Sequence, residues 1–289
     1  MDQEELLYSL EITNGYVFRQ IFELYVKLVI QFVQIFFSKD IITIRTGSGV
    51  KNGRKIITST ELNPNDLINY YFNEKCADIK ETEDNPAIIV EQFNITDIGN
   101  NFKSIAKTSG IQFYREKEKK ITSFRILGLT TDTFWVNCSK YQPVNYDLSG
   151  FEDIPETPNI KIDIKQFCAQ LKSMNKGDPE CFVFKVYKNA LEIESRNSND
   201  VILRKGSFGK IKGSLSSLSE RVAGSSDKEE EYFTTKVNSS VVDALGKINS
   251  MAIYSIVKIF CCKDGYLQIS HKIGDFGNHN IYLIEENEA

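Results

Sequence analysis

Residues 181–195 read CFVFKVYKNALEIES, two runs of alternating apolar and polar residues on either side of Lys188 and Asn189. Successive side chains of a β-strand point to opposite faces, so each run predicts a strand with one buried face and one exposed face. Asn is favoured in tight turns because it tolerates a positive φ. The stretch therefore predicts a β-hairpin.

The same pattern recurs along the chain. Residues 31–44 read QFVQIFFSKDIITI and residues 256–270 read IVKIFCCKDGYLQIS, each with a Lys-Asp pair where the two strands meet. Residues 111–126 read IQFYREKEKKITSFRI, a fourth hairpin with a charged tip. Recurrence at fairly even spacing indicates an internally repeated protein.

An amphipathic helical segment precedes each hairpin. The segments begin at Val17, Asp97, Asp163 and Asn238. Asp97, Asp163 and either Asn238 or Ser239 are suited to be N-caps, because their side chains can accept hydrogen bonds from the first free amides of a helix. Gly110 and Gly177 suit the left-handed residue that ends a helix.

Four helix-plus-hairpin units predict an α+β fold, with helices along one face of long antiparallel sheets and the units paired into two similar domains. Residues 145–159, NYDLSGFEDIPETPN, contain two prolines, a glycine and four acidic residues without periodicity, which is typical of a linker. We therefore expect an N-terminal domain at 1–144, a connector at 145–159 and a C-terminal domain at 160–289. Within the connector, Phe151 and Ile154 either pack locally or bind a partner.

Composition and charge limit the function classes. Hydrophobic residues make up 41% of the chain and charged residues 26%, which is typical of globular proteins. The net charge of -4 means that DNA binding would need basic residues gathered on one face.

The six cysteines include no Cys-x-x-Cys pair, which argues against zinc and thioredoxin-like sites and favours reduced thiols inside a cell. Residues 24–37 are apolar but are broken by Lys27, Gln31 and Gln34, so no membrane span is predicted.

An enzyme is not expected. The two histidines, His271 and His279, lie in the terminal segment, where a structural role is the more ordinary one. Residues 47–53, GSGVKNG, lack the spacing of a phosphate-binding loop and suit a hairpin turn at Asn52 and Gly53. We predict no catalytic residue, no metal site and no cofactor.

Basic residues occur on all four helical segments. They are Arg19 and Lys27 on the first, Lys103 and Lys107 on the second, Lys165 and Lys172 on the third, and Lys247 on the fourth. A single lysine on an exposed helix is ordinary solvated surface. If the helices share one face, however, together they form a positive stripe on an acidic protein.

From about Gly150 onward the chain resembles the proliferating-cell-nuclear-antigen (PCNA) family of DNA sliding clamps. The residues that carry the resemblance are Ile154-Pro155-Glu156, the acidic run 227–231, and Lys272-Ile273, Asp275, Gly277 and Tyr282-Leu283 near the end. In the N-terminal half, VFRQIFELYVKLV, SKDIITI and ITDIGNNFKSIAKTSG occupy matching places. Residues 46–85 are longer and differently composed than the family pattern, which indicates a distant eukaryotic or large-DNA-virus clamp.

The resemblance implies a non-enzymatic homotrimeric ring whose helices line a channel around double-stranded DNA, acting in the nucleus or a viral replication compartment. Contacts to phosphates would let the ring follow DNA without reading its sequence. Partners would be DNA polymerase, a clamp loader and repair proteins, which dock through short peptides with an apolar anchor and an aromatic pair. The matching groove residues here are Phe151, Ile154, Pro155, Tyr266, Tyr282 and Ile284. The family often has a small residue and a proline where Ile284 and Glu285 stand.

Two strand-like segments have the character of sheet edges that a second chain would cover. They are DTFWVNCSKY at 132–141 and NDVILRK at 199–205. Pairing between them would close a ring through Phe134, Trp135, Val136, Val201, Ile202 and Leu203. A monomeric processivity factor and a subunit of a heteromeric checkpoint clamp remain alternatives with the same fold.

Overall fold

A computed structural model describes residues 5–28, 30–50, 54–82, 86–128, 132–137, 155–209, 231–251, 256–262 and 266–285. Phe151 and Ile154 lie outside the described residues, so the connector is described only from Pro155 onward. The division into two domains therefore stays a prediction. We refer below to the N-terminal half, up to Asn137, and to the C-terminal half, from Pro155.

The N-terminal half contains nine strands and two α-helices in its described residues. They are β1 (Leu6–Ile12), α1 (Gly15–Lys27), β2 (Phe32–Phe37), β3 (Ile42–Val50), β4 (Arg54–Leu62), β5 (Asn69–Phe72), β6 (Ile89–Asn94), α2 (Ile95–Phe102), β7 (Gly110–Glu116), β8 (Ile121–Leu127) and β9 (Asp132–Asn137). Short 3-10 turns follow β4 at Pro64–Asp66 and β5 at Glu74–Cys76.

The C-terminal half repeats the helix-and-hairpin pattern. Its elements are β10 (Ile160–Asp163), α3 (Ile164–Met174), β11 (Cys181–Tyr187), β12 (Ala190–Arg196), β13 (Ile202–Gly209), β14 (Glu231–Asn238), α4 (Ser239–Leu245), β15 (Ile256–Cys262), β16 (Tyr266–Ile273) and β17 (Gly277–Glu285). A 3-10 turn at Ile248–Ser250 follows α4. The predicted α+β fold is confirmed.

The four predicted hairpins all form. Strands β11 and β12 pair from Cys181↔Arg196 to Tyr187↔Ala190 around the predicted tip. Strands β2 and β3, β7 and β8, and β15 and β16 form the other three antiparallel pairs. Strands β3 and β4 also pair, with Val50 opposite Arg54, while Asn52 and Gly53 lie outside the described residues.

The described strands form three antiparallel sheets. One runs β5-β1-β7-β8-β9, one runs β13-β12-β11-β14, and the central sheet runs β10-β15-β16-β17-β4-β3-β2-β6. Strand β17 pairs with β4 from Gly277↔Leu62 to Glu285↔Arg54, so the central sheet continues from one half into the other. Sequence patterns did not predict this pairing.

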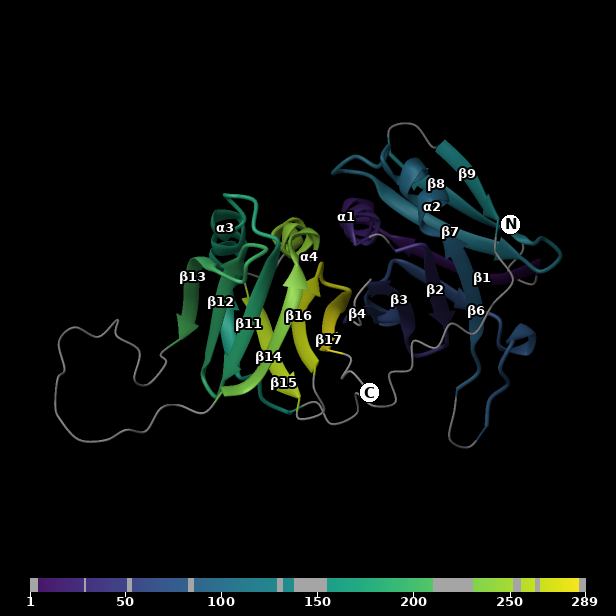
Figure 1. The fold of residues 1–289 in the computed structure, drawn as a ribbon. Helices are drawn as coiled ribbons and strands as arrows, with labels where there is room; N and C mark the ends of the chain where they lie inside the picture. Colours follow the sequence, from purple (N-terminus) through teal and green to yellow (C-terminus); the bar gives the residue numbers. More distant parts are fainter. Residues whose placement is uncertain are drawn as a thin grey trace, which may run out of the picture.

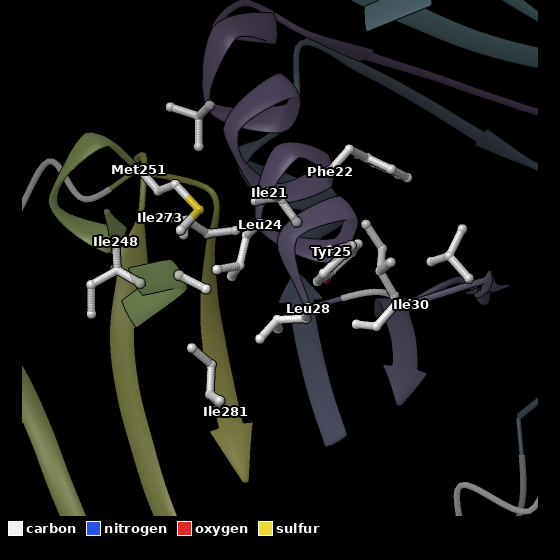
Figure 2. Packing of buried hydrophobic residues seen from close by; sticks show 14 of the residues in the cluster. Ile21, Phe22, Leu24, Tyr25, Leu28, Ile30, Ile248, Met251, Ile273 and Ile281 are labelled. Carbon is white, nitrogen blue, oxygen red and sulfur yellow. The ribbon is translucent and has the colours of Figure 1, made fainter. Parts of the chain in front are cut away.

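The helices gather on one side of the sheets, with α1 beside α4 where the two halves meet (Figure 1). In Figure 2, α1 turns Ile21, Leu24 and Leu28 toward Ile248 and Met251, which follow α4. All five side chains are buried in one hydrophobic core that extends through both halves. Burying an aliphatic side chain contributes roughly 1.5–3 kcal/mol, so this junction holds the halves firmly together.

The helix ends correct part of the capping prediction. Asp163 caps α3, accepting from the amides of Lys165 and Gln166 at 2.9 and 3.0 Å, as predicted. Asp97 does not cap α2, because Asn94 accepts from Thr96 N at 2.8 Å and starts the helix earlier. Asn238 occupies the cap position of α4 without a side-chain cap bond.

The two predicted helix-stop glycines behave differently. Gly177 has a φ of 106°, which suits the left-handed turn after α3. Gly110 instead begins β7, because α2 already ends at Phe102.

Candidate functional site

The predicted basic residues all belong to the helix-bearing side. Lys103, Lys107, Lys165, Lys172 and Lys247 are exposed, whereas Arg19 and Lys27 are half-buried. Three of them, Lys103, Lys107 and Lys247, lie beyond their helices and not on them. Lys107 follows the end of α2 by several residues, and Lys247 follows α4.

Four of these lysines mark the C-terminal ends of the four α-helices described. Lys27 is the last residue of α1, Lys103 follows α2, Lys172 lies in the last turn of α3, and Lys247 comes just after α4. A helix C-terminus carries partial negative charge, which a lysine complements. A lysine can complement the helix end and still add positive charge to the surface, because Lys103, Lys172 and Lys247 are exposed.

Arg19 has partners within the chain. Its Nε donates to Glu23 Oε1 at 2.7 Å, and its guanidinium also donates to the carbonyls of Lys103 and Ile105 at 2.9 and 3.1 Å. Arg19 thus ties α1 to the segment after α2 and fixes the place where Lys103 leaves the helix.

Lys27 and Lys247 bring positive charge together from the two halves. Partial burial lowers the pKa of Lys27, and the nearby Lys247 lowers that pKa further. Glu23 and Asp243 act in the opposite direction but do not reverse the shift. The fold therefore keeps two cations close to each other at the junction, an arrangement that an anion would stabilise.

The two predicted edge strands lie at opposite ends of the molecule (Figure 1). Trp135 of β9 is 65% exposed. At the other end, Val201 precedes β13, and Ile202 and Leu203 begin that strand, all three exposed. Exposed apolar side chains on unpaired strand edges are a liability unless another chain covers them.

The structure differs from the prediction in where β13 begins and in the direction that Val136 of β9 faces. Strand β13 begins at Ile202 and not at Asn199, because Asn197 and Asp200 form a turn in which Asn197 Oδ1 accepts from Val201 N at 2.9 Å. Val136, predicted at the subunit interface, is buried in the chain's own core. Residues 138–141 and the side chain of Phe134 lie outside the described residues.

A network of charges supports the β13 edge. Glu192 and Glu194 of β12 are almost fully buried, and Lys205 of β13 reaches Glu192 at 2.8 Å. Burial alone would raise the pKa of Glu194, but hydrogen bonds from Arg196 and Lys185 outweigh it and hold that pKa below its usual value. The network fixes β13 to its sheet.

The predicted peptide-groove residues only partly meet. Tyr266 and Tyr282 lie on neighbouring strands, their ring centroids 5.9 Å apart, and Ile284 packs against them. Ile57 of β4 completes this cluster, which the sequence did not indicate because Ile57 lies in the divergent stretch. Both tyrosines are buried, whereas Ile284 and Pro155 are partly exposed.

The two histidines lie deep in the junction between the halves. His271 and His279 are paired across β16 and β17, with ring centroids 5.3 Å apart. Thr60 Oγ1 lies 2.6 Å from His279 Nδ1 and 3.0 Å from the hydroxyl of Tyr25. Burial lowers the pKa of His271 to about 4 and that of His279 well below its usual value, so both rings are neutral at neutral pH.

Within the described residues, His, Cys, Asp and Glu side chains do not form a group of three that could hold a metal ion. In that same part of the chain, none of the helices has the length and apolar character needed to cross a membrane.

No family model matches the sequence, and no curated protein gives a significant match. Solved structures do match. The structure of Proliferating Cellular Nuclear Antigen from Entamoeba histolytica superimposes with a TM-score of 0.67 at 11% identity, covering 98% of this chain and 100% of that one. A chain of the PCNA2–PCNA3 complex from Sulfolobus tokodaii gives a TM-score of 0.63 at 13% identity, covering 96% and 98%. The chain therefore has the PCNA fold that its C-terminal half predicts.

Proposed function

We propose that the chain is a DNA sliding clamp, a non-enzymatic ring subunit that encircles duplex DNA and docks replication and repair proteins. The observation that carries this proposal is the division of the surface. The seven predicted basic residues lie on the helices or just after them, whereas the two ends of the molecule present strand edges with exposed apolar residues.

The ring closes when β9 of one copy pairs with β13 of the next. Such a head-to-tail contact uses two different surfaces, and it forms a closed ring if the rotation between copies allows. We propose three copies. The exposure of Trp135 argues against a monomer, because a large aromatic side chain on an unpaired edge promotes aggregation unless it is covered.

DNA passes along the helix-bearing side. The seven predicted residues, Arg19, Lys27, Lys103, Lys107, Lys165, Lys172 and Lys247, would contact phosphates directly or, for Arg19, position Lys103. Phosphate contacts carry no sequence information, which suits a ring that moves along DNA.

Partner proteins dock on the opposite side of the central sheet. Tyr266, Tyr282 and Ile284 would form the base of the proposed groove. Pro155 and the connector residues Phe151 and Ile154, the last two outside the described residues, are proposed to complete it. DNA polymerase, the clamp loader and repair proteins would insert an aromatic-pair peptide there, in the nucleus or a viral replication compartment. The docking requires that the buried tyrosines become accessible when the peptide binds.

The mass in solution and the mode of DNA binding test the proposal. Light scattering should give three times the chain mass of 33.0 kDa. On linear duplex with open ends the ring should thread on and slide off, whereas blocking both ends after loading should greatly lengthen its residence. A monomer, or residence that does not depend on the ends, would contradict the proposal.

Salt dependence tests the lysines. Replacing Lys103, Lys107, Lys165 and Lys172 by alanine should leave the mass unchanged. For each phosphate interaction that the substitutions remove, the slope of log affinity against log salt should flatten by about 0.9. An unchanged slope would mean that these lysines do not face DNA.

A further inference from the structure

A narrow cleft of about 230 Å³ opens between α1 and α2 on the helix-bearing side. Val26, Gly99 and Phe102 contribute an apolar floor, and Lys27 and Lys103 lie at its rim. Val26 is 50% exposed, so an apolar side chain stands open among the basic residues of this side.

The two helices approach closely at the floor of the cleft. A Cβ atom added at Gly99 would lie only 3.2 Å from Cγ2 of Val26, so glycine permits this spacing. Lys27 directly follows Val26 and Lys103 directly follows Phe102. The sequence thus places a cation beside an apolar residue on both walls.

The rim of the cleft carries a net positive charge. Glu23 also lines the cleft, but it accepts hydrogen bonds from Arg19 at 2.7 Å and from Gln20 at 3.1 Å. The ammonium of Lys103 donates to the amide oxygen of Asn100 at 3.0 Å, a neutral partner that does not offset its charge. Lys247 adds a further cation beside Lys27. An apolar floor under a cationic rim fits a small anion that also carries apolar surface.

The volume restricts what the cleft can hold. Pockets for drug-sized ligands span roughly 300–1,000 Å³, so this cleft suits one small unit only. We propose that it binds a single deoxyribose-phosphate unit of the encircled DNA, with the sugar against Val26 and the phosphate between Lys27 and Lys103. This inference rests on the proposed function and adds to it a contact that salt does not screen.

Affinity for a fluorescent 20-base-pair duplex, measured by anisotropy across a salt series, tests the sugar contact. Val26→Ser keeps every charge and removes the apolar contact, so affinity should fall about fourfold at every salt concentration with an unchanged slope. Lys103→Ala should instead flatten the slope by about 0.9. Ala169→Ser, at an exposed position of α3 on the same side, is the control and should change neither quantity.

Methyl resonances of Val26 distinguish the sugar from the phosphate. At constant ionic strength, deoxyribose 5-phosphate should shift them, whereas inorganic phosphate should not. If both shift them equally, the cleft is a phosphate site and the sugar contact is wrong.

If the wild-type protein binds duplex while Val26→Ser binds it equally well and the methyl resonances stay fixed, the cleft proposal fails and the clamp function stands. The proposed function itself fails only if the wild-type protein is a monomer or if its residence on duplex does not depend on blocked ends. The two failures are therefore distinct.

Discussion

The chain contains one strand-to-strand joint, the inner joint, and the proposed ring would need a second, the outer joint, formed between copies from the strand edges at its two ends. In the first, β4 and β17 pair along the whole of β17, and α1 covers the junction with buried apolar side chains. The halves of the second are β9, with Trp135 exposed, and β13, with Ile202 and Leu203 exposed. The inner joint extends a sheet and takes its apolar cover from the same chain, whereas the proposed outer joint would extend a sheet between copies.

This difference separates a permanent joint from a reversible one. The inner joint is packed like a protein core, so it should open only when the chain unfolds. In the proposed outer joint, the few exposed apolar residues of β13 would lie next to charged residues such as Arg204 and Lys205. We therefore expect a ring to open for DNA at β9 and β13, while the junction of the halves stays closed.

The largest effect should come from the outer joint. In Trp135→Asp, a carboxylate replaces the exposed aromatic ring of β9. A central aromatic residue at an interface contributes about 4 kcal/mol, so assembly should weaken by roughly a thousandfold. Sedimentation over a concentration series should show monomers that still unfold at the wild-type denaturant midpoint, once concentration is taken into account.

Ile68→Asp is the matched control, because Ile68 is also half exposed but lies away from β9 and β13. Its assembly should equal that of the wild type. Equal loss of assembly in both variants would mean that general surface apolarity, and not the β9 edge, holds the copies together.

The inner joint should respond in the opposite way. Leu24→Ala leaves a cavity where α1 meets Met251, and such truncations typically cost about 3 kcal/mol of folding free energy. Urea unfolding should show the loss, while the dissociation constant between folded copies should stay the same. Val26→Ala, on the exposed face of α1, should change the unfolding free energy by much less.

The sequence predicts the local elements well, because each depends on neighbouring residues. Period-2 alternation identified the four hairpins, and Asp163 identified the start of α3. Strand β13 begins later than predicted because a turn forms at Asn197. The cluster of Asn, Ser and Asp residues there was a sequence signal for that turn. The inward facing of Val136 depends instead on its register with Thr122 across β8 and β9.

The long-range features were not predictable from single patterns. Strands β4 and β17 are more than two hundred residues apart in the chain, and no local pattern specifies that partnership. Because of the same separation, the sequence did not show that Ile57 and Tyr282 are direct partners in the sheet. The placement of Lys103 and Lys247 just past their helices required the true helix ends.

Acid should lower the unfolding free energy of the chain through the two buried histidines of the inner joint. The pKa of His271 is lowered from 6.5 to about 4, so the folded state resists a proton that the unfolded chain accepts. The stability that depends on the neutral ring is fully present above pH 6.5 and is lost as the pH falls toward 4. At pH 5 the loss from His271 alone is about 2 kcal/mol.

Urea unfolding between pH 7 and pH 5 measures this effect while most carboxylates are still charged. The chain has only two histidines, so a variant with both His271→Phe and His279→Gln lacks histidine altogether. Its stability should be nearly flat over this range. If it falls as steeply as that of the wild type, groups other than the histidine pair cause the loss.

The smallest effect should come from the charges beside β13. Lys205 reaches Glu192 at 2.8 Å, but its side chain is 54% exposed, so the pair contributes only about 0.5 kcal/mol to folding. Lys205→Ala should leave chain stability almost unchanged and should weaken assembly about threefold at low salt, because the β13 edge becomes less well fixed. At about 0.5 M salt the difference should vanish, since salt screens the attraction between exposed charges.

Lys188→Ala, at the exposed hairpin tip between β11 and β12, is the control, because it removes the same charge away from the edge and should not alter assembly. A salt-independent loss in Lys205→Ala would show that its aliphatic stem contacts the neighbouring copy directly, and the outer joint would then extend farther along β13 than its apolar residues indicate.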